Sequence, residues 1–324
     1  DTVNGAGDWM SLPELSSALF GFKFDIIWFY APSMATAEVA YQVRDRADYM
    51  IASMFKYHPD NILGSAEWLP DLTGNPDMSV RVLAADITRA VFDAARNIAQ
   101  DTHAHSVLVN LTNISEVATD VSNLGRELED STGSFWNEVW DAWNASWTWF
   151  QMDSVSIHLR RFANQIQNQP NLSSSIKNCA GSLVASINAA VAVEFIYPTS
   201  FGPDAGGISI YLPWSQDKYD SVSYVQLDFS ETGWHSFIST FIQSFSGGFA
   251  GSLDIISIPS GARVFLNSVD TGYETDVLIG DLLPGYYGVR LVKSGYQDWT
   301  KPQEEVSVFP RQTTTLYAVL QPAP

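Results

Sequence analysis

The stretch FDIIWFYAPSMATAEVAYQVRDRADYMIAS, residues 24–53, indicates the fold class of the first part of the chain. It opens with the mostly apolar run FDIIWFY, which is typical of a strand buried on both faces of a parallel sheet. A turn that contains Pro32 and Ser33 leads into a segment with helical spacing, and a second strand-like run, DYMIAS, follows. Strand, helix and strand in this order predict an α/β crossover and a mostly parallel sheet. In α/β enzymes a turn between strand and helix often holds a nucleophile.

Further helices and strands alternate up to residue 246. Apolar residues at helical spacing predict helices within 79–100, 115–131, 135–150, 156–167, 173–191 and 232–245. Apolar or alternating runs predict strands at HSVLVNLTNI (105–114), VAVEFIYP (191–198), GGISIYLPW (206–214) and VQLDF (225–229). The pattern is that of one large α/β domain over residues 1–246.

The composition changes at SGGFAGS, residues 246–252, where glycine and serine indicate a linker. After it, short alternating strands are separated by turns rich in glycine and proline, and no helical spacing recurs. This pattern predicts a small all-β sandwich domain over residues 251–322.

Charge and cysteine content exclude several classes of partner and site. The chain has 324 residues and a formal net charge of −19, so nucleic acid and anionic membrane surfaces are disfavoured partners. No uninterrupted apolar stretch is long enough to predict a transmembrane span. Cys179 is the single cysteine, which rules out an internal disulfide, and its helical surroundings favour a small buried residue over a nucleophile.

The second part of the chain resembles the PEGA domain, a small β-sandwich found on prokaryotic envelope proteins. The resemblance is carried by SIPSGARVFL, LLPGYYGVRL and KSGY, and it covers essentially all of residues 251–321. It implies an adhesive or spacer module in which the PSGA turn and the PG-Y hairpin are structural.

The first part resembles the clostripain-like cysteine peptidases, which share a caspase-like α/β sandwich. The matching segments are DWMSLPELSSAL, residues 24–53, HSVLVNLTNISEV, GGISIYLPW and YVQLDFSETGWHSFI, and they cover nearly all of residues 1–245. The resemblance implies cleavage of peptides after basic residues by a Cys–His dyad, in which the thiolate attacks and the histidine transfers the proton. It also implies that the strand bearing the dyad histidine precedes this chain, so that the N-terminal part of the fold is not contained in it.

The turn at residues 30–34 departs from the family pattern, which reads Asp-Ala-Cys-x-Met followed by Glu-Val-Ala-Tyr. Ala31, Met34 and residues 38–41 match, but Pro32 stands at the cysteine position and Tyr30 at the position of an acid that helps to receive the basic side chain. Proline offers neither a thiol nor a backbone N–H. Ser33 lies one residue further on, so its side chain is expected to point elsewhere, and a serine nucleophile would need a positioned base. We therefore predict an inactive peptidase scaffold without a catalytic residue.

Other titratable residues give weaker signals of a site. His103 and His105, in THAH, are too few to define a metal site and are expected in a solvated loop, while His158 is expected on a helix surface. The acidic segments DNILGSAEW and DLTGNPDMS leave calcium as an option, but surface charge is the better interpretation because the spacing of a calcium loop is missing. No cofactor is predicted.

Four Asn-x-Ser/Thr triplets are candidate N-glycosylation sites, with the last two preferred: Asn110, Asn113, Asn144 and Asn171.

These observations predict a non-catalytic extracellular or cell-surface protein with a structural or assembly role, such as a filament or surface-layer subunit. Its partners would be further copies of itself or other surface proteins. One alternative is the heavy chain of a cysteine endopeptidase that cleaves after Arg or Lys and pairs with a separate N-terminal light chain. The other is a pseudoenzyme that binds peptides without cutting them.

Overall fold

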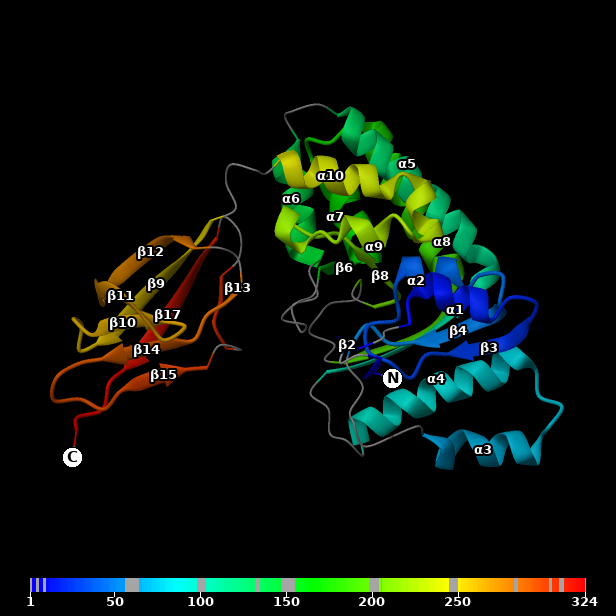
Figure 1. Cartoon of the computed structure of the whole chain (residues 1–324), viewed down its shortest axis with the longest axis horizontal. Coiled ribbons are helices and arrows are strands. Elements are labelled where there is room, and N and C mark those ends of the chain that lie inside the picture. Colours follow the sequence, from blue (N-terminus) through cyan, green and yellow to red (C-terminus); the bar gives the residue numbers. More distant parts are fainter. Residues whose placement is uncertain are drawn as a thin grey trace. The chain divides into compact units, whose positions relative to one another are not determined.

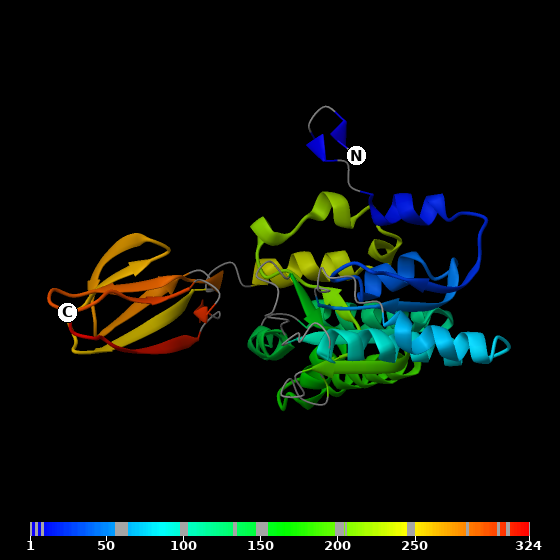
Figure 2. The same cartoon turned by 90° about the horizontal axis from the view of Figure 1, so that it is seen from below.

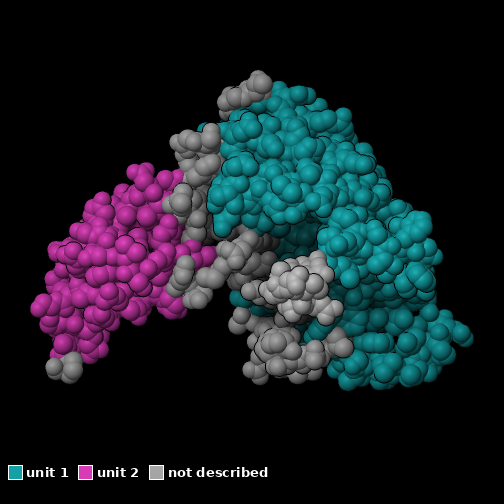
Figure 3. Space-filling model, viewed as in Figure 1, with its two compact units in different colours: residues 1–244 teal, residues 245–324 magenta. Residues whose placement is uncertain are grey.

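The computed structural model comprises two compact units, residues 1–244 and residues 245–324 (Figure 3). It describes residues 2–3, 6–7, 10–55, 64–97, 103–131, 135–146, 155–197, 204, 206–244, 250–282, 285–302, 305–308 and 312–323. Sequence patterns place the two domains at 1–246 and 251–322.

The first unit combines helices with a central sheet (Figure 1). Its helices are α1 (Leu12–Ala18), α2 (Ala37–Gln42), α3 (Ser65–Gly74), α4 (Val80–Asn97), α5 (Ile114–Asp130), α6 (Trp136–Ser146), α7 (Leu159–Asn168), α8 (Ser174–Ala190), α9 (Ser221–Tyr224) and α10 (Trp234–Ser244). The central strands are β3 (Phe24–Trp28), β4 (Ala47–Ala52), β5 (Ala104–Asn110) and β7 (Val191–Tyr197). Two small sheets pair β1 (Thr2–Val3) with β2 (Ala6–Gly7), and β6 (Ser156–His158) with β8 (Ser209–Tyr211).

The central sheet has the order β3-β4-β5-β7 and is mixed. Strands β3 and β4 are parallel, as the crossover predicts, but β5 runs antiparallel to both β4 and β7. Strands β3, β4 and β7 therefore run in one direction and β5 alone runs against them, so the sheet is mixed, and the predicted α/β class is confirmed. Two helices, α3 and α4, separate β4 from β5, and β5 begins opposite the end of β4.

Helices cover both faces of this sheet (Figure 1). Helix α4 places Ala84, Ile87 and Val91 against Ile51 and Leu108, which face it from the two central strands. Helices α2, α5 and α8 lie on the opposite face (Figure 1).

Strand β3 pairs only with β4 within the described part of the chain, so it forms an edge. Its Phe24 is 40% exposed and its last three residues are half-buried. The sequence predicts a strand buried on both faces, and that expectation is wrong because β3 has no neighbour on its outer side among the described residues.

Aromatic packing joins α6 to α10. Trp143 stacks on Trp140 with ring centroids 4.8 Å apart, and Phe241 lies 6.1 Å from the Trp140 ring. The indole N–H of Trp143 donates to the Leu212 carbonyl at 2.8 Å. Trp140 and Trp143 therefore belong to the core. The segment VQLDF, predicted as a strand, forms instead the turn between α9 and a 3₁₀ helix, Asp228–Thr232.

The second unit is a β-sandwich, as predicted, and its strands lie in facing layers (Figure 2). Its strands are β9 (Gly251–Ile258), β10 (Arg263–Leu266), β11 (Val269–Glu274), β12 (Val277–Leu282), β13 (Gly285–Tyr286), β14 (Val289–Val292), β15 (Trp299–Lys301), β16 (Ser307–Val308) and β17 (Thr313–Val319). One sheet has the order β11-β10-β14-β15 and the other β12-β9-β17. Leu253 and Ile255 meet Val264 and Leu291 in its core.

Candidate functional site

The turn between β3 and α2 is the candidate site, because the predicted nucleophile position lies there. Pro32 is exposed and Ser33 has a left-handed backbone, with φ 61°. A non-glycine residue in this region carries strain of about 1 kcal/mol or more, and such strain is concentrated at functional turns. Tyr30 packs edge-on against Trp28, with ring centroids 6.2 Å apart.

The backbone of this turn is held from two sides. The N–H of Ala35 donates to the Ser53 carbonyl at 3.0 Å, just beyond the end of β4. The Ala35 carbonyl accepts from the Ser209 N–H at 2.9 Å and from the Ser209 hydroxyl at 3.2 Å. The Thr36 hydroxyl then caps α2 by accepting from the Val39 N–H at 3.1 Å. None of these contacts involves the side chain at position 32.

Glu38, in the first turn of α2, is a buried structural anchor. Its side chain is 4% exposed, and its Oε1 accepts from the Tyr211 N–H at 2.9 Å and from the Tyr224 hydroxyl at 3.2 Å. Burial raises the pKa of Glu38, and the hydrogen bond from the Tyr211 N–H lowers it in part. The match of Glu38 to the family pattern therefore marks a residue that joins α2 to β8 and α9.

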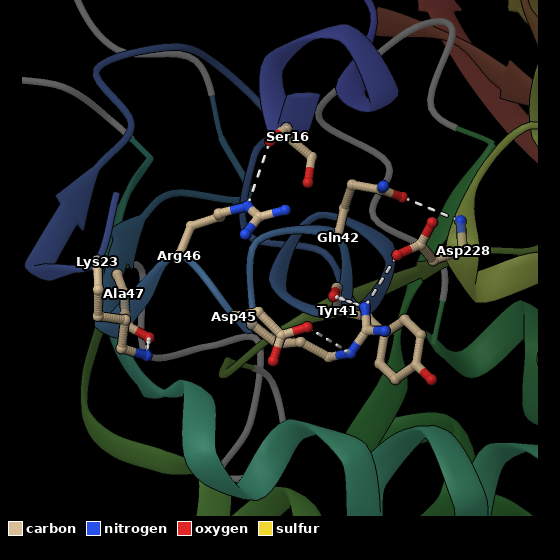
Figure 4. A network of polar contacts seen from close by, with 9 residues as sticks. Ser16, Lys23, Tyr41, Gln42, Asp45, Arg46, Ala47 and Asp228 are labelled. Atoms are coloured by element: carbon tan, nitrogen blue, oxygen red, sulfur yellow. Dashed lines mark hydrogen bonds and ion pairs between the residues drawn. The ribbon is translucent and has the colours of Figure 1, made fainter. Parts of the chain in front are cut away.

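The other end of α2 is tied down by charged side chains (Figure 4). Arg44 contacts Asp228 at 3.1 Å, and the Asp228 N–H donates to Gln42 Oε1 at 3.0 Å. Arg46 Nε donates to the Ser16 carbonyl at 3.2 Å, which connects α1 to this corner. Both ends of α2 are thus fixed, so the turn before it is a rigid part of the fold.

His105 does not lie in a solvated loop, as the sequence suggests, but on β5 with 3% of its surface exposed. The Met54 N–H donates to its Nδ1 at 3.1 Å, which assigns the ring proton to Nε2. Nε2 has no hydrogen-bond partner among the described residues. Burial lowers the pKa of His105 to about 3, and the charges of His158 and Arg160 contribute. The strand begins at Ala104, one residue before His105, and its first six residues are all buried, so this histidine lies inside the sheet.

His158 is also buried, at 3% exposure, and ends β6; the expected helix-surface position is wrong. It pairs with Ser209 across the small sheet, next to the contact that holds Ala35. Burial lowers the pKa of His158 to about 4, with contributions from Arg161 and Arg160. Both histidines are therefore neutral at pH 7.

Arg160 connects the helical layer to the sheet near these histidines. Its guanidinium contacts Glu194 on β7 at 2.5 Å and Asn188 on α8 at 3.3 Å. Gly206 approaches the same carboxylate so closely that a Cβ would lie 3.2 Å from Glu194 Oε2. This buried pair is structural: loss of Arg160 would leave Glu194 without a counter-charge.

The described residues include no group of three or more His, Cys, Asp or Glu side chains arranged to hold a metal ion. Of the two acidic segments considered for calcium, Asp71 lies in α3 and Asp77 in the turn after it, while Asp60 and residues 61–63 fall outside the described ranges. No helix within the described ranges has the length and apolar character required to cross a membrane.

The four candidate glycosylation asparagines differ in accessibility. Asn171 is exposed between α7 and α8, with its amide donating to Glu138 at 2.7 Å. Asn110 accepts from the Thr112 N–H and hydroxyl, and Asn113 donates to the Ala189 carbonyl at 2.7 Å. The Oδ1 of Asn144 is buried in α6. Glycosylation stays a prediction, and Asn171 is the site that this geometry favours.

Family comparisons agree with this fold. Residues 1–241 match the clostripain family, and residues 250–324 match the PEGA domain. The chain belongs to the clostripain family, and a PEGA domain follows its family region. No curated protein sequence matches it significantly.

Solved structures show the same fold at low sequence identity. A cysteine protease from B. fragilis aligns with a TM-score of 0.54 and 18% identity, covering 72% of this chain and 97% of that protein. A clostripain from Bacteroides thetaiotaomicron, solved with a peptide inhibitor, aligns with a TM-score of 0.51 and 13% identity, covering 69% and 94%. A secreted cysteine protease from the same species gives 0.51 and 14%, covering 68% and 59%. The predicted caspase-like α/β fold is confirmed.

Proposed function

We propose that this chain is a non-catalytic member of the clostripain family that serves a structural or assembly role outside the cell. The carrying observation is the turn after β3, where an exposed Pro32 occupies the predicted nucleophile position. Its ring offers no nucleophile, and its nitrogen has no hydrogen to stabilise an oxyanion. The backbone of the turn nevertheless remains held by Ser53 and Ser209.

The nearby histidines support this proposal. A general base must reach the group that it deprotonates and must have a pKa near the working pH. His105 and His158 are buried, with pKa values lowered to about 3 and about 4, and are suited to packing rather than to proton transfer at pH 7. Neither histidine is therefore suited to act as a general base for Ser33 at pH 7.

The first expected result is an absence of peptidase activity. The purified chain should release fluorophore from Arg- and Lys-containing peptides at the rate of the buffer blank, with and without calcium, while an active clostripain cleaves the same peptides. Turnover in proportion to protein concentration would contradict the proposal. A Ser33→Ala variant then identifies the source of any activity. The variant loses the activity if Ser33 is the nucleophile and keeps it if a contaminating protease is responsible.

An extracellular location and self-association complete the proposal. The support is the PEGA domain, the secreted relative from Bacteroides thetaiotaomicron and a charge of −19, which keeps a protein soluble. Sedimentation velocity should show concentration-dependent association, and negative-stain microscopy should show ordered assemblies. A chain that stays monomeric over the whole concentration range contradicts the assembly role.

Among the described residues no strand pairs with the outer edge of β3, and this favours a second candidate. An edge strand accepts an added strand by main-chain hydrogen bonds. A separate N-terminal light chain or an extended peptide would fit this edge, giving a two-chain peptidase or a peptide-binding pseudoenzyme. The same fluorogenic peptides distinguish them: binding without cleavage, measured by fluorescence anisotropy, supports the pseudoenzyme.

A further inference from the structure

The outer face of the β12-β9-β17 sheet carries an exposed apolar patch. Because side chains alternate along a strand, Leu253, Ile255 and Ile279 point into the core while their neighbours point outward. The outward apolar residues are Ile256, Ile258, Leu278, Tyr317 and Val319, which we call the sandwich patch.

The residues of the sandwich patch are contiguous across three strands. Tyr317 pairs with Ile256 and Val319 pairs with Ile258 in the β17–β9 ladder, while Leu278 on β12 pairs with Asp254 and so lies one step diagonally from Ile256. Four of the five are strongly exposed: Tyr317 by 73%, Ile258 by 67%, Leu278 by 60% and Val319 by 59%. The solvent-facing side of a sheet in a β-sandwich normally carries polar residues. An exposed apolar patch on that side therefore marks an interaction surface.

The distribution of polar and apolar residues along the strands restricts how a second copy can bind to the sandwich patch. Two acidic residues lie beside the patch. Asp276, an exposed residue just before β12, accepts from the Ser257 N–H at 2.9 Å. Asp254 pairs with Leu278 and Thr315, one step before Ile256 and Tyr317. Polar residues Ser252 and Thr313 lie further toward that end, while the opposite end, with Ile258 and Val319, is apolar. A two-fold axis through the apolar end brings apolar residues together and leaves each Asp254 at the periphery of the contact.

The size of the patch also fits a second copy. Side chains exposed to this degree present roughly 500 Å² per copy, so a symmetric pair buries about 1,000 Å², the lower limit of a specific interface. Two such sheet faces pack with their strands nearly aligned, as in any sandwich. An anionic membrane fits less well, since the patch includes no basic side chain and the chain carries a charge of −19.

We propose that the sandwich patch is the contact through which two copies of this chain pair symmetrically, sheet face to sheet face. The inference rests on the self-association in the proposed function and names the surface that mediates it. A dimer whose interface area is at this lower limit is weak, and we expect a dissociation constant in the micromolar range. Added salt tightens it, because it screens repulsion between two acidic chains and strengthens apolar burial.

The test uses full-length chains with single exposed substitutions. Tyr317→Lys and Leu278→Lys place a charge in the contact and should raise the dimer dissociation constant at least about tenfold in sedimentation velocity. Tyr273→Lys is the matched control: Tyr273 is also an exposed tyrosine of the same unit, at 52%, but lies on β11 in the other sheet. It should change the constant by less than about twofold.

A cross-linking arm tests the two-fold axis. In a Cys179→Ser background, Val319→Cys at the apolar end should be joined between copies by a short bis-maleimide, whereas Thr313→Cys at the polar end should not. Equal cross-linking at both positions overturns the symmetric arrangement.

The outcomes separate this inference from the proposed function. If the wild type associates but Tyr317→Lys and Leu278→Lys associate equally well, the sandwich patch is not the contact, while the assembly role stands. If the wild type never associates, both fail. Binding of the wild type, but not of Tyr317→Lys, to phosphatidylcholine vesicles without dimerisation would replace the second copy by a lipid surface and overturn the proposal.

Discussion

Acidification from pH 7 to pH 4.5 is expected to destabilise the first unit by several kcal/mol. The unfolded chain protonates its histidines near pH 6.5, whereas the folded chain keeps His105 and His158 neutral down to about pH 3 and about pH 4. Between these values the unfolded state binds more protons, so stability is full above pH 6.5 and falls as the pH drops. Each histidine contributes a slope of about 1.4 kcal/mol per pH unit.

Glu38 acts in the opposite direction over a narrower window. Burial raises its pKa in the folded state, so the folded chain takes up this proton before the unfolded chain as the pH falls toward 4.5. Below the folded-state pKa of Glu38, this proton uptake offsets part of the stability that the two histidines remove. It does not reverse the loss, because two histidines change the free energy of unfolding more steeply with pH than one glutamate does.

Urea unfolding at several pH values, followed by tryptophan fluorescence, measures this dependence. Ten of the eleven tryptophans precede residue 245, leaving only Trp299 in the second unit, so the signal reports the first unit. His105→Asn keeps an acceptor for the Met54 N–H and should flatten the pH dependence, although it lowers stability at pH 7. His235→Asn, at a half-buried histidine of α10, is the control. An unchanged slope in His105→Asn would contradict the assignment.

The second large effect is expected from Trp143→Ala. Trp143 is 1% exposed, stacks on Trp140 and donates to the Leu212 carbonyl. Truncation costs about 4 kcal/mol for lost packing and about 1–2 kcal/mol for the unpartnered buried carbonyl. A loss of this size approaches the whole stability of a typical domain.

Calorimetry should separate the two units in this variant. The first unit should melt at a much lower temperature, while the second, which has its own core around Leu253 and Val264, should melt as in the wild type. Trp143→Phe, which retains a ring but not the donor, should give an intermediate shift. Equal displacement of both transitions would show that the units unfold together.

Most of the fold follows from local patterns in the sequence. The helical spacing and the run at residues 24–53 predict β3, α2 and β4 in the right order, because burial of one helix face and of a strand leaves a periodic signature. Strand direction is not local: β5 runs antiparallel to β4, and the spacing of apolar residues in the two helices between them does not indicate it. VQLDF has the alternation of a strand, yet its Phe229 is buried within a 3₁₀ segment.

The candidate site shows the same division. Its turn and Pro32 are visible in the sequence, since a strand, a proline and a helix start are adjacent there. The neighbours of that turn come from residues 53, 105, 158 and 209, and only the folded chain brings them together. Glu38 offers a usable signal, because a carboxylate between the apolar residues of a short helix has to find buried donors.

The turn after β3 also determines how the chain tolerates change at its predicted reactive position. The hydrogen bonds described above involve the backbone of residue 35 and the Thr36 hydroxyl, whereas Pro32 is exposed. Loss or regain of a thiol at residue 32 is therefore nearly neutral for folding, within about 0.5 kcal/mol apart from the rigidity that proline adds. The residue type at position 32 and the architecture around it are therefore separable, so under the proposed function a single substitution there would alter the chemistry of the turn and leave the scaffold intact.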